Sequence, residues 1–250
     1  MVGAPWTPSG PDLAAFEQIL AERKPRLFIT NAGPQIPTGG ALAAVTAHRL
    51  LKLAERHELL IVEDEVYADM EAEASPRLAA FDGLERVLVI GSFSKTLSAA
   101  GRCGFIAARA DWMEGLTDLK VATSFGGGGL TAELTHAILT DGAYRRYLTA
   151  LRERLARARG ETLARLASMG LSPWIEPASG IFLWMRLPDG LDGGEVAQRA
   201  LAEGVELAPG EAFSASRSWR DYLRFNAAQS ADPRIYEVLE RAIRQVRAGR

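Results

Sequence analysis

The chain has 250 residues, a formal net charge of −2 and one cysteine, with 48% hydrophobic and 24% charged residues. This length can bury a core as one large domain or two modest ones, and the composition is that of an ordinary globular protein. The balanced charge provides no basic footprint for nucleic acid, one cysteine excludes an internal disulfide framework, and no apolar run is long enough to span a membrane. We therefore expect a cytoplasmic protein that binds neither nucleic acid nor membrane directly.

The first part of the chain alternates predicted helices with buried strands. A start rich in Pro and Gly, residues 1–10, lacks an apolar signal core. The predicted elements that follow are a helix at 11–23, a strand at 26–30, a turn-rich loop at 31–40, a helix at 41–57, a strand at 59–64 and a strand from Val87. This order predicts right-handed βαβ crossovers and a mostly parallel sheet flanked by helices.

The pattern changes in the second part of the chain. A further strand is predicted at 104–108, followed by helices at 110–120, 131–139 and 144–169. Short strands then come at 173–176, 180–187, 205–208 and 222–225, with helices at 194–203 and 233–246. This is the pattern of an α+β unit. We predict a large α/β domain at residues 1–147 and a small α+β domain at 148–250.

Chemically active side chains follow three of the predicted strands. Gln35 to Gly39 comes after the first, Asp64 to Tyr67 after the second, and Ser92 to Lys95 after the third. Because ligands bind beyond the carboxyl ends of parallel strands, these segments predict one shared crevice. Two other interpretations fit the same positions. Asp64 and Lys95 can form a structural salt bridge, or they can belong to a phosphoaspartate site, although no additional acid lies near Asn31.

The surroundings of Lys95 favour a phosphorylated cofactor. Ser92, Ser94 and Arg102 supply hydroxyls and a fork-shaped cation, which suit a phosphate group. Lys95 itself is an amine nucleophile, and Asp64 lies at the neighbouring strand end. An amine, a phosphate cradle and a carboxylate are together what pyridoxal 5′-phosphate (PLP) requires. The pattern indicates no metal site.

Five motifs resemble those of class I/II aminotransferases of PLP fold type I. They are Pro37-Thr-Gly39, Glu63-Asp-Glu-Val-Tyr67, Ser92-Phe-Ser-Lys-Thr-Leu97 with Arg102, Pro209-Gly-Glu-Ala-Phe213 and Tyr222-Leu-Arg-Phe-Asn226. They occur in the family's order and at similar spacing, from about residue 10 to 245. Each motif alone is weak, whereas the ordered set is specific.

The resemblance implies a role for each matching residue. Lys95 would form a Schiff base with PLP and then move a proton once the substrate displaces it. Asp64 would pair with the pyridinium nitrogen, and Tyr67 would hydrogen-bond the phenolate oxygen. Ser92 and Arg102 would hold the phosphate. Arg224 would bind the substrate α-carboxylate, with an amino acid or amine as the substrate class.

One departure from the family concerns the first loop. Ile36 stands where ordinary aminotransferases place an asparagine that contacts the phenolate oxygen, and isoleucine cannot make that hydrogen bond. MocR-type regulators, which belong to the GntR family, have an aminotransferase-like domain that often carries an apolar residue at this position, directly after a glutamine. Gln35 and Ile36 match that pattern here. The alternative function is therefore a PLP-binding effector domain with little or no turnover.

The second departure is an expected absence. The family domain has about another hundred residues before the point that matches Met1, including a sheet strand and the aromatic residue that stacks on the cofactor ring. We therefore expect the N-terminal part of the fold to be missing and the sheet to expose an apolar edge. Because the family's sites form between two subunits, the resemblance also implies a homodimer.

Overall fold

The computed structural model describes residues 1–249, and these divide into two compact units. The first, here called the sheet unit, comprises Ala4–Pro34 and Ala41–Leu151. The second, the C-terminal unit, comprises residues 1–3, 35–40 and those from Arg152 onward. The division falls inside the long helix α6, Ala143–Ser168. The predicted domain limit between residues 147 and 148 lies in the same helix and stays a prediction.

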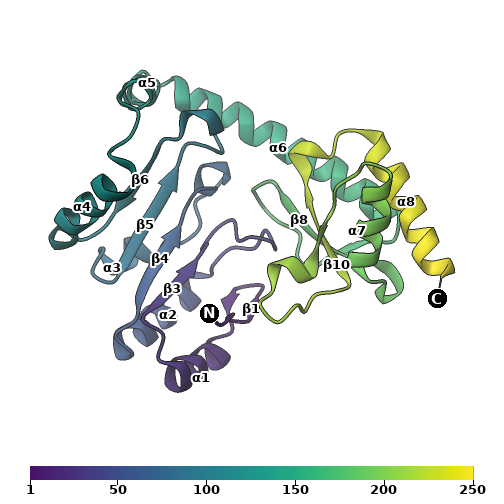
Figure 1. The fold of residues 1–250 in the computed structure, drawn as a ribbon, viewed down its shortest axis with the longest axis horizontal. Coiled ribbons are helices and arrows are strands. Elements are labelled where there is room, and N and C mark those ends of the chain that lie inside the picture. The colour runs from purple at the N-terminus through teal and green to yellow at the C-terminus, as the bar shows by residue number, and fades with distance from the viewer. Residues whose placement is uncertain (250) are drawn as a thin grey trace. The chain divides into compact units, whose positions relative to one another are not determined.

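A four-stranded sheet in the order β3-β4-β5-β6 organises the sheet unit (Figure 1). Strands β3 (Leu27–Thr30), β4 (Leu60–Asp64) and β5 (Val87–Ser92) are parallel, and β6 (Gly104–Ala107) runs antiparallel to β5. The predicted mostly parallel sheet is therefore confirmed. Along β5, buried and half-buried residues alternate because neighbouring side chains of a strand point to opposite faces.

Helices of the sheet unit accompany these strands in chain order. Their bounds are α1 Leu13–Arg23, α2 Ala44–Arg56, α3 Leu78–Asp82, α4 Met113–Ser124 and α5 Gly129–Thr140. In α2, the buried residues Ala47, Leu50 and Ala54 recur at the three- and four-residue spacing of one helix face. They join Leu59 and Ile61 in the core of this unit. Asp12 begins α1 because its carboxylate accepts hydrogen bonds from the first helical amides.

Glu63 is a fully buried acid that ties β4 to α3. Its carboxylate accepts hydrogen bonds from the backbone amides of Leu78 at 2.8 Å and Ala79 at 2.9 Å, the first amides of α3. Burial raises the pKa of Glu63, and the two amide donors partly oppose that rise. The side chain thus satisfies a helix start that would otherwise bury unpaired donors.

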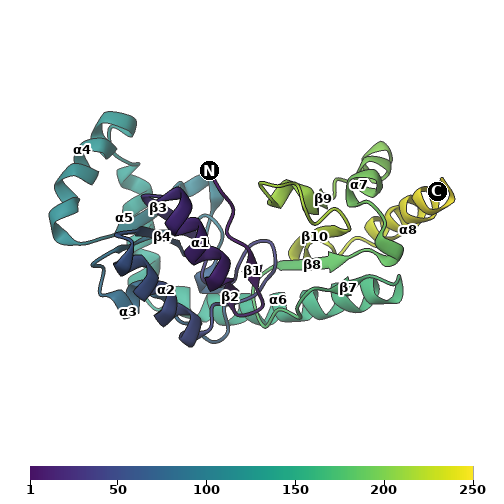
Figure 2. The ribbon, with the colours of Figure 1, turned by 90° about the horizontal axis from the view of Figure 1, so that it is seen from below.

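The C-terminal unit is built on an antiparallel sheet in the order β7-β8-β10-β9. The strands are β7 Ser172–Pro173, β8 Phe182–Arg186, β9 Ala208–Pro209 and β10 Tyr222–Asn226. Helices α7 (Gly193–Ala202) and α8 (Pro233–Ala248) lie next to one another beside these strands (Figure 2). Their buried side chains share a core with Leu183, Met185 and Leu223. This arrangement of strands and helices is the predicted α+β unit.

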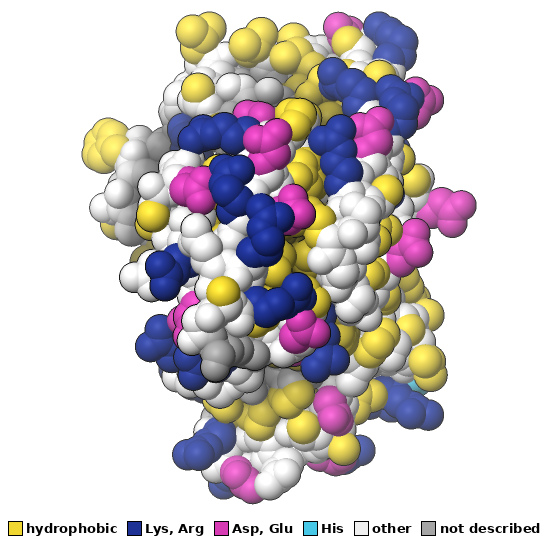
Figure 3. Space-filling model, turned by 90° about the vertical axis from the view of Figure 1, so that its right-hand side faces the viewer, with side chains coloured by type: hydrophobic (Ala, Val, Ile, Leu, Met, Phe, Trp, Pro, Cys, Tyr) yellow, Lys and Arg dark blue, Asp and Glu magenta, His cyan; other side chains and the backbone are white. Residues whose placement is uncertain are grey.

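Charges of both signs are mixed on the face that carries α7 and α8 (Figure 3). Several of them pair, including Arg241 with Glu203 at 2.7 Å and Arg220 with Asp192 at 3.0 Å. Exposed pairs of this kind add little stability. None of the helices that the structure describes is long and apolar enough to cross a membrane.

At three places the structure differs from the predictions made from the sequence or gives them more detail. Residues 6–11 form a small hairpin of β1 (Trp6–Thr7) and β2 (Gly10–Pro11), which the turn-rich composition did not indicate. The strand predicted at 173–176 is shorter and lies at Ser172–Pro173. The apolar edges expected in the sheet are present: Ile29 on β3 is 64% exposed and Phe105 on β6 is 49% exposed.

Replacing Glu63 with alanine should destabilise the chain by about 1–3 kcal/mol, because two buried amides lose their acceptor. Urea unfolding followed by circular dichroism measures the change. The control is Glu17→Ala, which removes an exposed ion pair with Arg56 and should shift the unfolding free energy by less than about 0.5 kcal/mol. Equal effects of the two substitutions would show that Glu63 does not anchor α3.

Candidate active site

Strands β4 and β5 are paired in parallel, so the residues that end them lie at one edge of the sheet. Asp64 is the last residue of β4 and pairs with Ile90, two residues before Ser92 at the end of β5. Strand β6 returns antiparallel with Gly104 opposite Ser92, which brings the preceding Arg102 to the same edge. The structure therefore brings together the predicted residues of the sheet unit at the carboxyl ends of β4 and β5.

Three consecutive acids close β4, and each has different surroundings. Glu63 accepts a hydrogen bond from the first amide of α3, while Glu65 forms an ion pair with Arg77 at 2.7 Å. Burial raises the pKa of Glu65, and the charge of Arg77 opposes that rise. Asp64 is half-buried, and its Oδ1 accepts a hydrogen bond from the amide of Val66 at 3.0 Å. Because side chains alternate along a strand, Asp64 points to the opposite face from Glu63.

Lys95 lies in the turn after β5 and has an exposed side chain. Its Nζ is 5.7 Å from the centroid of the Tyr67 ring, which is itself buried. Within the described residues, Lys95 and Asp64 do not form an ion pair with each other, so the salt-bridge interpretation is wrong. The amine thus stands over an aromatic face with its charge not neutralised by that acid.

Local hydrogen bonds shape the turn that carries Lys95. The Oγ of Ser92 accepts from the amide of Ser94 at 3.1 Å, and the carbonyl of Phe93 accepts from the amide of Leu97 at 2.8 Å. These bonds satisfy the backbone as the strand ends and the chain turns. Hydrogen bonds between residues of the turn itself therefore stabilise it, and Ser92 is the residue that begins it.

Arg102 adopts a left-handed backbone conformation, with φ of 48°, and its side chain is exposed. A glycine follows at position 104, where a Cβ would come within 2.6 Å of the Gly91 carbonyl oxygen. Glycine is thus required for β6 to pair with β5, and this pairing positions Arg102 beside Ser92. The Oγ of Ser92 also donates to the carbonyl of Cys103 at 3.4 Å.

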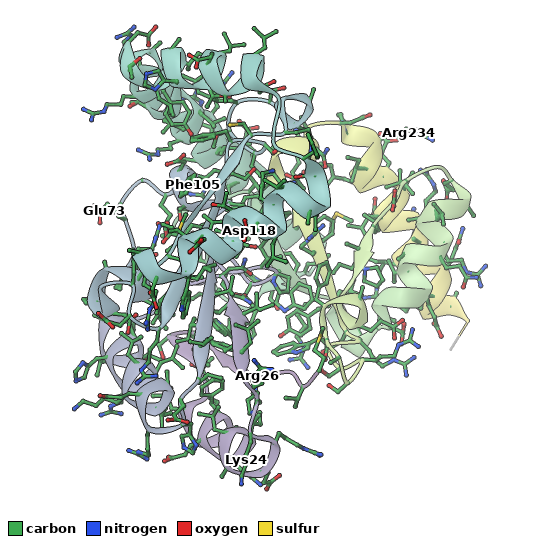
Figure 4. The ribbon with its side chains drawn as sticks, turned by 60° about the vertical axis from the view of Figure 1, so that its left-hand side comes forward. Lys24, Arg26, Glu73, Phe105, Asp118 and Arg234 are labelled. Atoms are coloured by element: carbon green, nitrogen blue, oxygen red, sulfur yellow. The ribbon has the colours of Figure 1, made fainter. Side chains whose placement is uncertain are left out.

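A groove of about 570 Å³ borders Arg102 between β6 and α4. Figure 4 labels Phe105 on β6 and Asp118 on α4, two of the elements that line it, and the start of α5 also contributes. Phe105 and Met113 contribute apolar lining, and Lys120 contributes a second cation. Arg102 and Lys120 thus place two cationic side chains along this groove, and cations of this kind favour binding of an anion.

Arg224 belongs to the C-terminal unit, where it lies on the central strand β10 opposite Trp184 of β8. Its guanidinium carbon is 4.4 Å from the ring centroid of Phe182 and 4.6 Å from that of Phe213. Two aromatic rings thus fix the plane of the guanidinium group. A fixed plane is the geometry that bidentate carboxylate binding uses.

The loop at Gln35–Gly40 also belongs to the C-terminal unit and is stabilised by its own glutamine. The side-chain amide of Gln35 donates to the Ile36 carbonyl at 2.6 Å and accepts from the Thr38 amide at 3.2 Å. Gln35 therefore serves the loop backbone. Ile36 is half-buried and offers no hydrogen-bonding side chain.

Four residues that surround these groups were not among the candidates predicted from the sequence. Phe182 and Phe213 flank Arg224, and Thr96 and Tyr144 form a buried hydrogen bond beneath the Lys95 turn. Phe213 and Thr96 each lie within a recognised motif, so the sequence did offer a signal for these two residues. Nothing in the local sequence indicated the contact between Thr96 and Tyr144, because 48 residues separate them. Among the described residues no group of three or more His, Cys, Asp or Glu could hold a metal ion.

Known proteins with similar sequences include both enzymes and regulators. The 2-aminoadipate transaminase of Thermus thermophilus is 31% identical over 227 residues, which are 88% of this chain and 57% of that protein. The HTH-type transcriptional regulator NorG of Staphylococcus aureus is 27% identical over 207 residues, 81% of this chain and 47% of that protein. The chain thus spans about half to three fifths of the length of these relatives. Both classes suggested by the motifs are represented.

Solved structures with the same fold include those of aminotransferases. The α-aminoadipate aminotransferase LysN of Thermus thermophilus, in complex with N-(5′-phosphopyridoxyl)-L-leucine, superposes with a TM-score of 0.88 at 30% identity, over 99% of this chain and 66% of that one. The kynurenine aminotransferase of Pyrococcus horikoshii, in complex with PMP, has a TM-score of 0.88 at 25% identity, over 98% of this chain and 63% of that one. These matches confirm the predicted PLP fold type I.

The sequence also matches a family pattern described as aminotransferase class I and II over residues 7–241, which include every predicted site residue. The match agrees with the motif order, the parallel sheet and the solved structures. The chain therefore belongs to the class I and II aminotransferase family.

Proposed function

We propose that this chain is the PLP-binding part of an aminotransferase that acts on amino acids through Lys95. The observation that carries the proposal is the edge of the sheet unit at which Lys95, Asp64, Tyr67, Ser92 and Arg102 come together. The family and the ligands of the solved relatives support the cofactor. A cytoplasmic location and a homodimer stay predictions.

The residues at this edge fit the cofactor by their chemistry. The Ser92 hydroxyl and the Arg102 guanidinium, at the same end of the sheet, suit its phosphate, and the half-buried Asp64 carboxylate at the end of the neighbouring strand suits its ring nitrogen. When bound, PLP supplies an aldehyde that condenses with an amine and a protonated ring that withdraws electrons from adjacent bonds.

Each residue then has a definite task. Lys95 Nζ attaches the cofactor through its amine and, once released, accepts and returns a proton at the same atom. Asp64 keeps a proton on the ring nitrogen by its negative charge. Tyr67 donates a hydrogen bond from its hydroxyl to the phenolate oxygen of the cofactor. Ser92 and Arg102 hold the cofactor phosphate. In the C-terminal unit, Arg224 orients the substrate by its carboxylate.

A specific observation favours a second function. Ile36 cannot hydrogen-bond the cofactor, and the Gln35 amide is taken up by its own loop. The relatives also include NorG, a transcriptional regulator. The second candidate is therefore an effector domain that binds PLP and an amino compound with little turnover.

An amino-acid half-reaction separates the two functions. The chain, loaded with PLP, is mixed with L-2-aminoadipate or an aromatic amino acid, the substrates named for its relatives. A transaminase converts the cofactor to pyridoxamine phosphate, which chromatography detects. Spectral change without that product indicates an effector domain.

Lys95→Ala should abolish covalent attachment of PLP, because we assign that attachment to Lys95, in the turn directly after β5. The chain is incubated with PLP, treated with borohydride, digested and examined by mass spectrometry. Wild type should carry the phosphopyridoxyl group on the Lys95 peptide. Lys52→Ala, at an exposed lysine on α2, is the control and should retain that modification. If attachment in wild type is spread evenly over Lys24, Lys52, Lys95 and Lys120, the proposal fails.

Arg224→Lys should weaken binding of the amino-acid carboxylate by roughly tenfold or more, because an ammonium cannot form the planar two-pronged contact. Spectral titration of the PLP-loaded chain with amino acid measures the affinity. Arg220→Lys, at an exposed arginine paired with Asp192, is the matched control. Similar affinities for both variants would remove Arg224 from the substrate site.

A further inference from the structure

A buried hydrogen-bonded group lies directly beneath the turn that carries Lys95. The hydroxyl of Tyr144 is 2.8 Å from Thr96 Oγ1 and donates to Asp69 Oδ2 at 2.5 Å. These three side chains come from three separate segments of the sheet unit: the start of α6, the turn after β5 and the 3₁₀ turn Ala68–Met70 after β4. The group has no part in the roles assigned above.

The available protons fix the direction of these bonds. A tyrosine hydroxyl has one hydrogen, and Tyr144 gives it to the Asp69 carboxylate. Thr96 must therefore donate its own hydrogen to the Tyr144 oxygen. Burial, and then the neighbouring Asp69, raise the pKa of the Tyr144 hydroxyl, so this donor stays protonated.

The consequence for Lys95 follows from its place in the chain. Thr96 is only 3% exposed, whereas the preceding Lys95 is exposed. A buried anchor on Thr96 holds the backbone of the turn while the adjacent side chain points outward. Asp69 lies two residues after Tyr67, so the same group connects the Lys95 turn to the turn that carries Tyr67.

Packing around Tyr144 is independent of its hydroxyl. Its ring meets Phe93 edge to face at a centroid distance of 6.1 Å, and Phe93 in turn contacts Phe105 at 6.0 Å. The carboxylate of Asp141 begins α6 by accepting from the Ala143 amide at 2.7 Å. Helix α6 and the aromatic contacts therefore do not require the hydroxyl, and removing it tests the hydrogen bonds alone.

We propose that Tyr144 is a positioning residue that, through Thr96 and Asp69, sets where the Lys95 amine stands relative to Tyr67. Tyr144 acts through Thr96 and takes no part in bond making. The inference rests on the proposed role of Lys95 at the PLP site. It adds a residue that the family motifs did not indicate.

The test compares Tyr144→Phe with Tyr147→Phe, an exposed tyrosine one turn along the same helix. The first readout needs no cofactor: partial reductive methylation of the full chain with formaldehyde, scored for each lysine by mass spectrometry. Tyr144→Phe should change the relative labelling of Lys95 by about threefold or more, while Lys24, Lys52 and Lys120 serve as internal references. Tyr147→Phe should match wild type. Wild-type labelling of Lys95 in Tyr144→Phe overturns the proposal.

The second readout is the PLP concentration that gives half-maximal borohydride-trapped Lys95. Loss of a buried bond in a group that includes a carboxylate should raise this concentration by about tenfold in Tyr144→Phe. If wild type traps no PLP on Lys95, the proposed function fails, whereas the methylation readout still tests the positioning role. The two failures are thus distinguishable.

A pair of substitutions at Thr96 keeps the proposal testable if Tyr144→Phe does not fold. Thr96→Ser retains the hydroxyl and should behave as wild type in both readouts. Thr96→Val has the same shape without the hydroxyl and should reproduce the Lys95 changes. A double variant, Tyr144→Phe with Thr96→Val, should be no worse than Tyr144→Phe alone, because the bond that Thr96→Val removes is already absent in Tyr144→Phe. Equal behaviour of the serine and valine variants contradicts the proposal.

Discussion

Parallel pairing of β4 with β5 is the constraint on which the candidate active site depends. The register that sets Asp64 opposite Ile90 makes both strands end at the same edge, so that the turns after them become neighbours. Antiparallel β6 then returns Arg102 to that edge, which only a glycine at position 104 permits. A change of register by one residue would turn Asp64 to the other face of the sheet.

The acids at the end of β4 show how structural and chemical demands are separated within one strand. Glu63 and Glu65 make structural contacts within the protein. Glu63 accepts a hydrogen bond at the start of α3, and Glu65 pairs with Arg77. Asp64, between them, points to the other face, and its carboxylate accepts a short-range hydrogen bond from the Val66 amide. Strand alternation thus separates Asp64 from the two acids that hold the scaffold.

Each of the two units, taken by itself, holds side chains of a different chemistry. Side chains of the sheet unit combine an amine, a hydroxyl, a carboxylate and a phenol, which suit covalent chemistry and an anionic group. The C-terminal unit holds Arg224 between Phe182 and Phe213, which suits a planar carboxylate. In the loop at Gln35–Gly40, Ile36 has no side chain that can hydrogen-bond the cofactor, and the Gln35 amide donates to the Ile36 carbonyl of the same loop. The absence of this cofactor contact is why a regulatory function with little turnover remains the second candidate.

The sequence by itself determined the fold and most of the candidate site. Periodicity located β3, β4, β5 and the long helix, because strand and helix patterns are local, and five ordered motifs identified the family and its candidate residues. The tertiary structure decided what depends on contacts between distant segments. It shows that Asp64 and Lys95 do not form an ion pair with each other. It also shows that Glu63 is buried and accepts a hydrogen bond from the first amide of α3, and that Tyr144 forms a hydrogen bond with Thr96, 48 residues away in the sequence. Such contacts leave no local pattern, since a tyrosine that packs in a core and one that donates a hydrogen bond there look alike in sequence.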